Sequence, residues 1–173
     1  MASVAGADPA QLLRPATDAD APAINRLVAA AYSPYIPLIG RTPIPMLTDY
    51  AIAVREHDVW VLVADGTIVG ALELVAYPDH LWLEDVAILP AWQGRGLGGS
   101  LIRHAEDEAR RRSLPEIRLL TNERYEADIA IYTHYGYRET HRRPHLGTDL
   151  VYFAKAIGLS DQAGAAASDG HIE

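Results

Sequence analysis

Cysteine is absent from this sequence of 173 residues. Its absence excludes a disulfide framework, a cysteine-ligated metal and thiol catalysis. No apolar run approaches the ~18 residues that a membrane-spanning helix needs, and residues 1–9 show neither the basic nor the apolar segment of a secretory signal peptide. We therefore expect a cytoplasmic protein with no bound metal and no membrane partner.

Positive charge is the scarcer sign in the chain. The 15 Lys and Arg residues face 23 Asp and Glu residues, which gives a net charge of −8 when histidine is neutral. Binding of nucleic acid without regard to sequence relies on cationic side chains that neutralise phosphates, so we expect no nucleic-acid partner. Hydrophobic residues make up 49% and charged residues 22% of the chain, which is a globular balance, and the length predicts one domain.

The composition changes near both ends of the chain. Residues 1–10 are small and polar, and residues 158–173 are rich in Gly, Ala, Ser and Asp. We expect a flexible leader and a disordered tail there, around a single domain that spans residues 11–157.

Hydrophobic periodicity divides this domain into strands and helices. The predicted strands are 11–15, 59–64, 67–76, 80–89, 116–121, 137–142 and 148–156, and the predicted helices are 21–32, 46–56, 96–113 and 128–135. Only one strand–helix–strand crossover is clear. We therefore predict an α/β (α+β) domain with a mixed, mostly antiparallel sheet flanked by helices.

Glycines gather where the buried strand 80–89 leads into the helix that begins near residue 96. The run is Gln-Gly-Arg-Gly-Leu-Gly-Gly, residues 93–99. Successive glycines let a ligand approach the backbone, and the first amides of a helix bind anions, so the loop predicts a phosphate or pyrophosphate site. No lysine follows the glycines, which excludes a Walker A loop. A dinucleotide pattern matches through Gly94, Gly96 and Gly99, but an antiparallel hairpin precedes the unit, which is the wrong context.

Read as Gln-x-x-Gly-x-Gly, the same loop resembles the GNAT superfamily of N-acetyltransferases. Residues 86–90 resemble that family's cofactor-facing strand, residues 132–137 resemble its helix ending in Tyr-x-x-x-Gly-Tyr, and residues 12–157 follow its order of elements. The resemblance implies the GNAT fold, acetyl-coenzyme A (acetyl-CoA) as cosubstrate, and acetylation of a primary amine. The cofactor contacts that it implies are Val86, Ala87, Ile88, Gln93, Gly94, Arg95, Gly96, Leu97, Gly98, Gly99, Asn122, Asp128 and Tyr132.

Acetyl transfer to an amine requires two proton transfers, because the ammonium must lose a proton and the leaving thiolate must gain one. Tyr132 fits the acid role by resemblance and by chemistry, since a phenol with an ordinary pKa near ~10 is protonated at neutral pH. Without cysteine there is no acyl-cysteine intermediate, so we expect direct attack of the amine in a ternary complex.

A carboxylate in the strand 80–89 is the predicted base. We choose Glu84, acting directly or through water, because a carboxylate is costly in an apolar strand unless it is paired or used. Pairing with an arginine such as Arg14 or Arg118 is the alternative. In a regular strand Asp85 faces the other side, and a bulge would change that parity. His80 is the reserve base.

The acceptor is a small-molecule or peptide amine that the sequence does not identify. Residues 32–45 are rich in proline and apolar side chains, so they form either a packed irregular connection or a wall of the substrate cleft. We place Tyr35, Ile36 and Glu84 in the acceptor site and expect residues 142–147 to help shape it. A non-catalytic acyl-CoA-binding or sensor domain is the alternative function, and a homodimer is expected by analogy.

Overall fold

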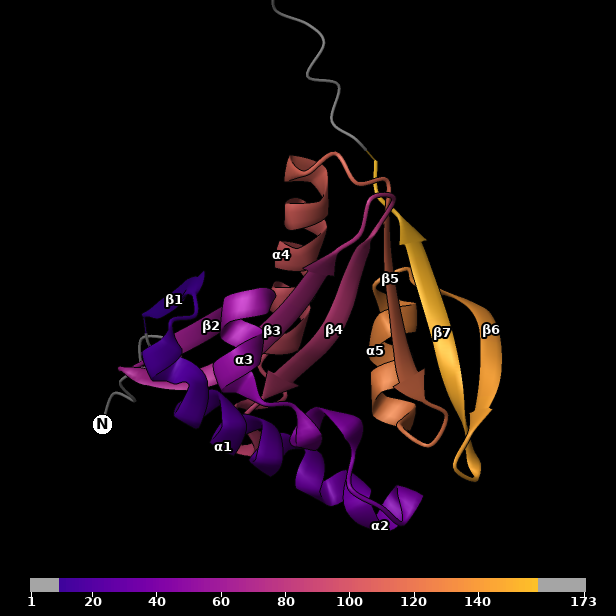
Figure 1. The fold of residues 1–173 in the computed structure, drawn as a ribbon, viewed down its shortest axis with the longest axis horizontal. Coiled ribbons are helices and arrows are strands. Elements are labelled where there is room, and N and C mark those ends of the chain that lie inside the picture. Colours follow the sequence, from indigo (N-terminus) through magenta and orange to yellow (C-terminus); the bar gives the residue numbers. More distant parts are fainter. Residues whose placement is uncertain (1–9, 159–173) are drawn as a thin grey trace, which may run out of the picture.

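The computed structural model describes residues 10–158, so the expected leader and tail lie almost wholly outside the described residues. Seven strands form one sheet in the order β1-β2-β3-β4-β5-β7-β6 (Figure 1). The strands are β1 (Gln11–Pro15), β2 (Asp58–Ala64), β3 (Thr67–Ala76), β4 (Leu81–Ile88), β5 (Glu116–Asn122), β6 (Arg138–His145) and β7 (Thr148–Ala156). Only β4 and β5 pair in parallel, which confirms the predicted mixed, mostly antiparallel sheet.

Five α-helices accompany the sheet among these residues. They are α1 (Ala21–Tyr32), α2 (Ile36–Ile39), α3 (Tyr50–Glu56), α4 (Leu97–Arg111) and α5 (Glu126–His134). Single 3-10 turns occupy Asp18–Asp20, Ser33–Tyr35, Ile44–Leu47 and Pro90–Trp92. None of the helices in residues 10–158 has the length and apolar character needed to cross a membrane.

Two hydrophobic cores lie on the two faces of the sheet. Residues of α1 and α3, such as Leu27 and Tyr50, cluster with Ala71 of β3 on one face. Residues of α4, such as Leu101, cluster with Leu72 on the other face. Neighbouring residues of β3 thus enter opposite cores, as the period of two in a strand requires. The sheet is covered by helices on both sides (Figure 1).

The local sequence explains most element boundaries. The turn between β2 and β3 is Asp65-Gly66, with φ of 49° and 74°, the left-handed pair that a two-residue hairpin needs. The second predicted helix begins at Tyr50 rather than at residue 46, because the side chain of Asp49 caps it by accepting the N–H of Ala51 at 3.0 Å. The strand predicted over 137–142 runs on to His145.

Strands β4 and β5 separate soon after they begin. Their register pairs only Leu81 with Ile117 and Trp82 with Arg118. In contrast, β4 remains paired with β3 as far as Ile88. The two strands diverge toward the end of β4 (Figure 1). The second half of β4 therefore presents backbone groups that β5 does not pair, on the side where the sequence predicts a cofactor.

A β-bulge interrupts β4 opposite β3. Glu73 pairs with Asp85, and the next pair joins Leu74 to Leu83, so Glu84 is the extra residue. A bulge shifts the alternation of side chains by one residue. Of the two possibilities given by the sequence, the bulge is confirmed, so the parity of a regular strand does not hold from this point on and Asp85 does not face away from Glu84.

Candidate active site

The glycine loop (residues 93–99) borders a cavity of about 470 Å³, which we call the loop cavity. This cavity lies between the loop, β4, α1 and α5. Its walls bring together most of the residues expected to contact the cofactor: Val86, Ala87, Ile88, Gln93, Gly94, Gly96, Leu97, Gly98, Gly99, Asp128 and Tyr132. The strand, the loop and the helix singled out in the sequence therefore meet around one space.

Two glycines set the backbone of the loop. Gly94 and Gly96 have φ of 76° and 78°, in the left-handed region that glycine adopts without a steric penalty. No atom lies within 4 Å of the place that a Cβ would take on either residue. Backbone conformation, and not crowding, is therefore the reason for glycine here. The Nε2 of Gln93 donates to the Ile88 carbonyl at 3.0 Å, which ties the loop to the end of β4.

Helix α4 begins directly behind this loop, with Gly96 as its N-cap. The first amides of a helix have no partner within the helix and carry the positive end of its dipole. Leu97, Gly98 and Gly99 of the first turn all line the loop cavity. A phosphate or pyrophosphate suits this position, so the residues present fit the coenzyme A moiety that the family resemblance implies.

Two residues expected to contact the cofactor lie outside the walls of the loop cavity. The Arg95 guanidinium stacks over the Trp92 ring, 4.5 Å from its centroid. Asn122 is buried, donates to Thr148 Oγ1 at 2.7 Å, and accepts the backbone N–H of Arg124 at 3.0 Å. Asn122 therefore holds the end of β5 against the chain around it.

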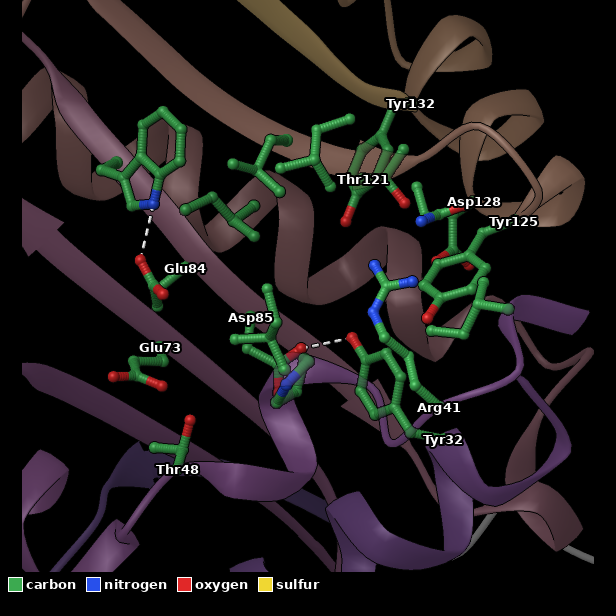
Figure 2. A pocket seen from close by; sticks show the side chains of 18 residues that line it. Tyr32, Arg41, Thr48, Glu73, Glu84, Asp85, Thr121, Tyr125, Asp128 and Tyr132 are labelled. Carbon is green, nitrogen blue, oxygen red and sulfur yellow. Dashed lines mark hydrogen bonds between the residues drawn. The ribbon is translucent and has the colours of Figure 1, made fainter. Parts of the chain in front are cut away.

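A second cavity, which we call the carboxylate cavity, contains Glu73, Glu84 and Asp85 in its wall (Figure 2). Its volume is about 150 Å³. Residues between α1 and α3 form one side of it, namely Ile39, Arg41, Ile44, Pro45 and Thr48. Part of the proline-rich segment therefore lines a cavity, and the interpretation of this cavity as the substrate cleft stays a prediction. Among residues 10–158, no group of three or more acidic or histidine side chains is arranged to hold a metal ion.

Asp85 is one of the two buried carboxylates of this cavity, and Glu73 is the other. The Tyr32 hydroxyl donates to Asp85 Oδ1 (Figure 2), and the Tyr50 hydroxyl donates to Oδ2 at 3.0 Å. Burial raises the pKa of Asp85 to about 7, although both tyrosine hydrogen bonds oppose the shift and the charge of Glu73 adds to it. A carboxyl with such a pKa can accept a proton near neutral pH.

Glu84 also lines the carboxylate cavity, but its side chain is exposed and accepts the Trp82 indole N–H at 2.6 Å (Figure 2). The alternative in which Glu84 pairs with Arg14 or Arg118 is wrong, because both arginines pair with other carboxylates. His80 lies outside the cavity wall, where it hydrogen-bonds the preceding aspartate at 2.8 Å.

Tyr132 lines both cavities and stands where they meet. Burial, with the charges of Asp128 and Asp85 as further causes, raises the pKa of Tyr132 far above its ordinary value. Its phenol is therefore protonated across the physiological range, as a proton donor must be. Tyr32 and Asp128 also line both cavities.

Asp128 accepts a hydrogen bond from a neighbouring tyrosine. Its Oδ1 accepts the Tyr35 hydroxyl at 3.1 Å, and burial raises the pKa of Asp128 to about 6.

Comparison with known proteins agrees with this arrangement. A family model described as acetyltransferase (GNAT) family matches residues 24–137, which is well over half of the chain. The chain belongs to the GNAT acetyltransferase family. The interpretation of the glycines as a dinucleotide-binding pattern therefore loses its support.

Individual relatives of this GNAT chain are distant. The streptothricin acetyltransferase of Streptomyces lavendulae is 41% identical over 51 residues, which cover 28% of this chain and only 27% of that protein. The alanine N-acetyltransferase of a ribosomal protein from Escherichia coli superimposes with a TM-score of 0.72 at 20% identity, over 89% of this chain and 98% of that chain. The PaiA N-acetyltransferase from Thermoplasma acidophilum, in complex with coenzyme A, has a TM-score of 0.70 at 13% identity, over 83% and 98%. At these identities the two structures show a shared fold.

The residues expected to bind the acceptor do not line one common cavity in this GNAT chain. Tyr35 lines the loop cavity, where its ring stacks on Tyr125 with 4.1 Å between centroids. Ile36 is outside the walls of both cavities, and so is every residue of 142–147. Glu84 lines the carboxylate cavity, as described above.

Sequence reasoning missed Tyr50 and Glu73 and included Tyr32 only as the first residue of the proline-rich segment. It placed Asp85 on the other side of a regular strand and left open the bulge that the structure contains. Tyr32 and Tyr50 sit at a helix end and a helix start, where an aromatic residue is usually part of the core. Glu73 is the fully buried acidic residue of β3, and a carboxylate in the middle of an apolar strand is the one signal that could have found it.

Proposed function

We propose that this chain transfers the acetyl group of acetyl-CoA to a primary amine of a small molecule or peptide, by direct attack in a ternary complex. The observation that carries the proposal is the meeting of two cavities at Tyr132. One is built around an anion-binding loop, and the other contains a carboxyl of near-neutral pKa. Membership of an acetyltransferase family supports the same reaction class.

The loop cavity is the proposed site for acetyl-CoA, which supplies a reactive thioester when bound. The amides of Gly96 to Gly99 would hold the pyrophosphate, and the unpaired second half of β4 would lie along the pantetheine arm. A backbone N–H of Val86 or Ala87 would stabilise the negative charge that develops on the thioester oxygen. The complex of the related PaiA enzyme with coenzyme A supports this placement by analogy of fold.

Asp85 is the proposed base, in preference to Glu84. Asp85 is buried in the carboxylate cavity beside Tyr32, which reaches both cavities, whereas Glu84 is exposed and already accepts a hydrogen bond from Trp82. Asp85 would take a proton from the ammonium directly or through Tyr32, and Tyr132 would donate its proton to the departing thiolate.

The charges around the carboxylate cavity favour a cationic acceptor. Glu73, Glu84, Asp85 and Asp128 line it, against the single cation Arg41. Opposite charge concentrates a protonated amine at such a site. The partial similarity to a streptothricin acetyltransferase supports an amine-bearing small molecule as the first class to test.

Two finer points belong to the same proposal. A homodimer would use the free edge of β6, whose side chains are largely exposed, and light scattering tests it. A cytoplasmic location is a prediction that fractionation of the source cells tests.

The experiment that tests the proposed function combines binding and turnover. Acetyl-CoA is expected to raise the melting temperature, while NAD and ATP leave it unchanged. A panel of primary amines is then screened with acetyl-CoA by detection of the released thiol. Stabilisation by acetyl-CoA with no thiol release from any amine would favour the non-catalytic acyl-CoA-binding alternative. Stabilisation by NAD alone would contradict the assignment.

A further inference from the structure

A row of polar side chains leads from the carboxylate cavity toward the protein surface. We propose that this row, Asp85, Tyr50, Glu73 and His57 in order, carries the proton taken from the acceptor amine out to solvent. The inference rests on the proposed function, because it concerns the fate of the proton that Asp85 would receive.

The reaction creates a need for such an exit. An ammonium and a thioester become an amide and a thiol, and one proton is released to solvent in each turnover. Tyr132 gives its proton to sulfur and regains one from the attacking nitrogen, so the proton left to discharge is the one on Asp85. Asp85 is buried, and the acceptor fills the cavity on its open side.

Tyr50 is the first link behind Asp85. Its hydroxyl donates to Asp85 Oδ2 at 3.0 Å, and its side chain is fully buried. Glu73 stands opposite Asp85 in the strand register, and the Tyr50 hydroxyl is close enough to lower the pKa of Glu73 as well. A hydroxyl accepts and donates at once, so Tyr50 can pass a proton between these carboxyls without ionising.

Glu73 is the second link, and one of its oxygens has no other role. Its Oε1 and the Nδ1 of His57 form a hydrogen bond of 2.5 Å. Its Oε2 is buried and has no hydrogen-bond partner among the described residues. An unpaired buried carboxylate oxygen is unfavourable, and here it offers the acceptor position that a proton arriving through Tyr50 needs. Burial raises the pKa of Glu73, so its carboxyl can hold that proton briefly.

His57 ends the row at the surface, since its side chain is 34% exposed. The proton on Asp85 passes to the Tyr50 oxygen while the proton of Tyr50 moves to Glu73 Oε2. The proton between Oε1 and Nδ1 then moves onto the imidazole, which releases one from Nε2 to water. The Glu73 carboxyl then rotates, and the neutral imidazole exchanges its tautomer through water (Nε2 gains a proton and Nδ1 loses one), which restores the starting state. The other charged groups that face the row are Glu84 and Asp128, and both favour protonated carboxyls within it.

Chemical rescue tests this row. Replacing His57 by alanine is expected to lower kcat by about tenfold, below the usual loss of a general acid or base, and to leave KM for the amine unchanged. Added imidazole should restore kcat in the His57→Ala variant, since it can take the proton from Glu73. Glu73→Gln should show a similar loss without rescue, because the break then lies inside the protein. His141 is an exposed histidine on β6, so His141→Ala is the matched control. Its kcat should equal that of the wild type, and added imidazole should not change it.

Two results would overturn the inference: a His57→Ala variant that is as fast as the wild type, or a slow one that imidazole does not restore. A second arm needs no acceptor amine. In the free protein, Tyr50→Phe should raise the pKa of the Glu73 carboxyl, read by NMR, because the Tyr50 hydroxyl lowers it; an unchanged Glu73 pKa would also overturn the inference. Failure of the proposed function looks different, since no variant and no wild-type protein would then release thiol.

Discussion

The loop cavity and the carboxylate cavity differ in how the chain builds them. The anion-binding side of the loop cavity is made of consecutive residues that run from a buried strand through a glycine loop into a helix, although α1 and α5 supply its other walls. Its chemistry is supplied by backbone amides, which need only the right local conformation. The carboxylate cavity takes its walls from separate segments, and its key side chain is placed by a bulge. A site made of backbone amides can therefore be predicted from the sequence. A site made of side chains on paired strands depends on the strand register, which the sequence does not show.

The largest expected effect separates the two neighbouring carboxylates of β4. Asp85→Asn should lower kcat by about 10²–10⁴-fold, the usual loss of a general base, whereas Glu84→Gln, its matched control, should keep most of the activity. The pKa of Asp85 is raised in the fold, so its ionised form costs stability as pH rises through about 7. The asparagine variant should consequently melt no lower than the wild type at pH 8, which a thermal scan checks. Equal losses in both variants would mean that the buried position of Asp85 gives it no special role.

Tyr132→Phe tests the point where the cavities meet. The ring would remain packed against Tyr137 and Phe153, so the fold and the Kd for acetyl-CoA should hardly change. We expect kcat to fall by about 10²-fold, because the donor to the thiolate is lost. Steady-state kinetics with acetyl-CoA varied at saturating amine measures both quantities. An unchanged kcat would remove Tyr132 from the acid role.

Gly96→Ala tests whether the loop acts through its backbone. Gly96 has a φ of 78°, and Gly66 in the β2–β3 turn has a φ of 74°, with no atom near either Cβ position. Alanine at either site should cost about 1–2 kcal/mol of stability. Only Gly96→Ala should weaken acetyl-CoA binding, by about tenfold (~1.4 kcal/mol), as measured by calorimetry. Equal acetyl-CoA affinities in the two variants would count against the loop cavity as the cofactor site.

Asn122→Ala should have the smallest effect on the use of acetyl-CoA, since Asn122 lines the carboxylate cavity and not the loop cavity. It removes the hydrogen bonds to Thr148 and to the backbone of Arg124 and should cost about 1–3 kcal/mol of unfolding free energy. KM for acetyl-CoA should stay the same, because Asn122 lies outside the loop cavity. Denaturant unfolding and steady-state kinetics measure the two quantities. A raised KM at unchanged stability would restore the role that the family resemblance implies.

Local patterns predicted the fold well. The alternating apolar residues of β2 and β3, the Asp65-Gly66 turn and the helix from Ala21 to Tyr32 all have strong short-range signals. The order of elements then left few topologies for the sheet. The start of α3 was misplaced because the cap at Asp49 outweighs the apolar periodicity before it.

The side chains of the candidate active site were harder to predict for a physical reason. The pair Glu84-Asp85 was visible in the sequence, but the bulge that decides which of them is buried is a property of two paired strands. The partners of Asp85 come from α1 and α3, 53 and 35 residues away in sequence. Such contacts leave no local pattern, so the chemistry of Tyr32, Tyr50 and Glu73 became apparent only in the folded chain.

The pH dependence of kcat/KM for the wild type, Asp85→Asn and Glu84→Gln decides whether Asp85 is the base. The base must be ionised to accept a proton, so activity should rise with pH and level off near the Asp85 pKa of about 7. Glu84→Gln should keep this acid limb, and Asp85→Asn should lose it. An acid limb that disappears in Glu84→Gln and persists in Asp85→Asn would make Glu84 the base in place of Asp85.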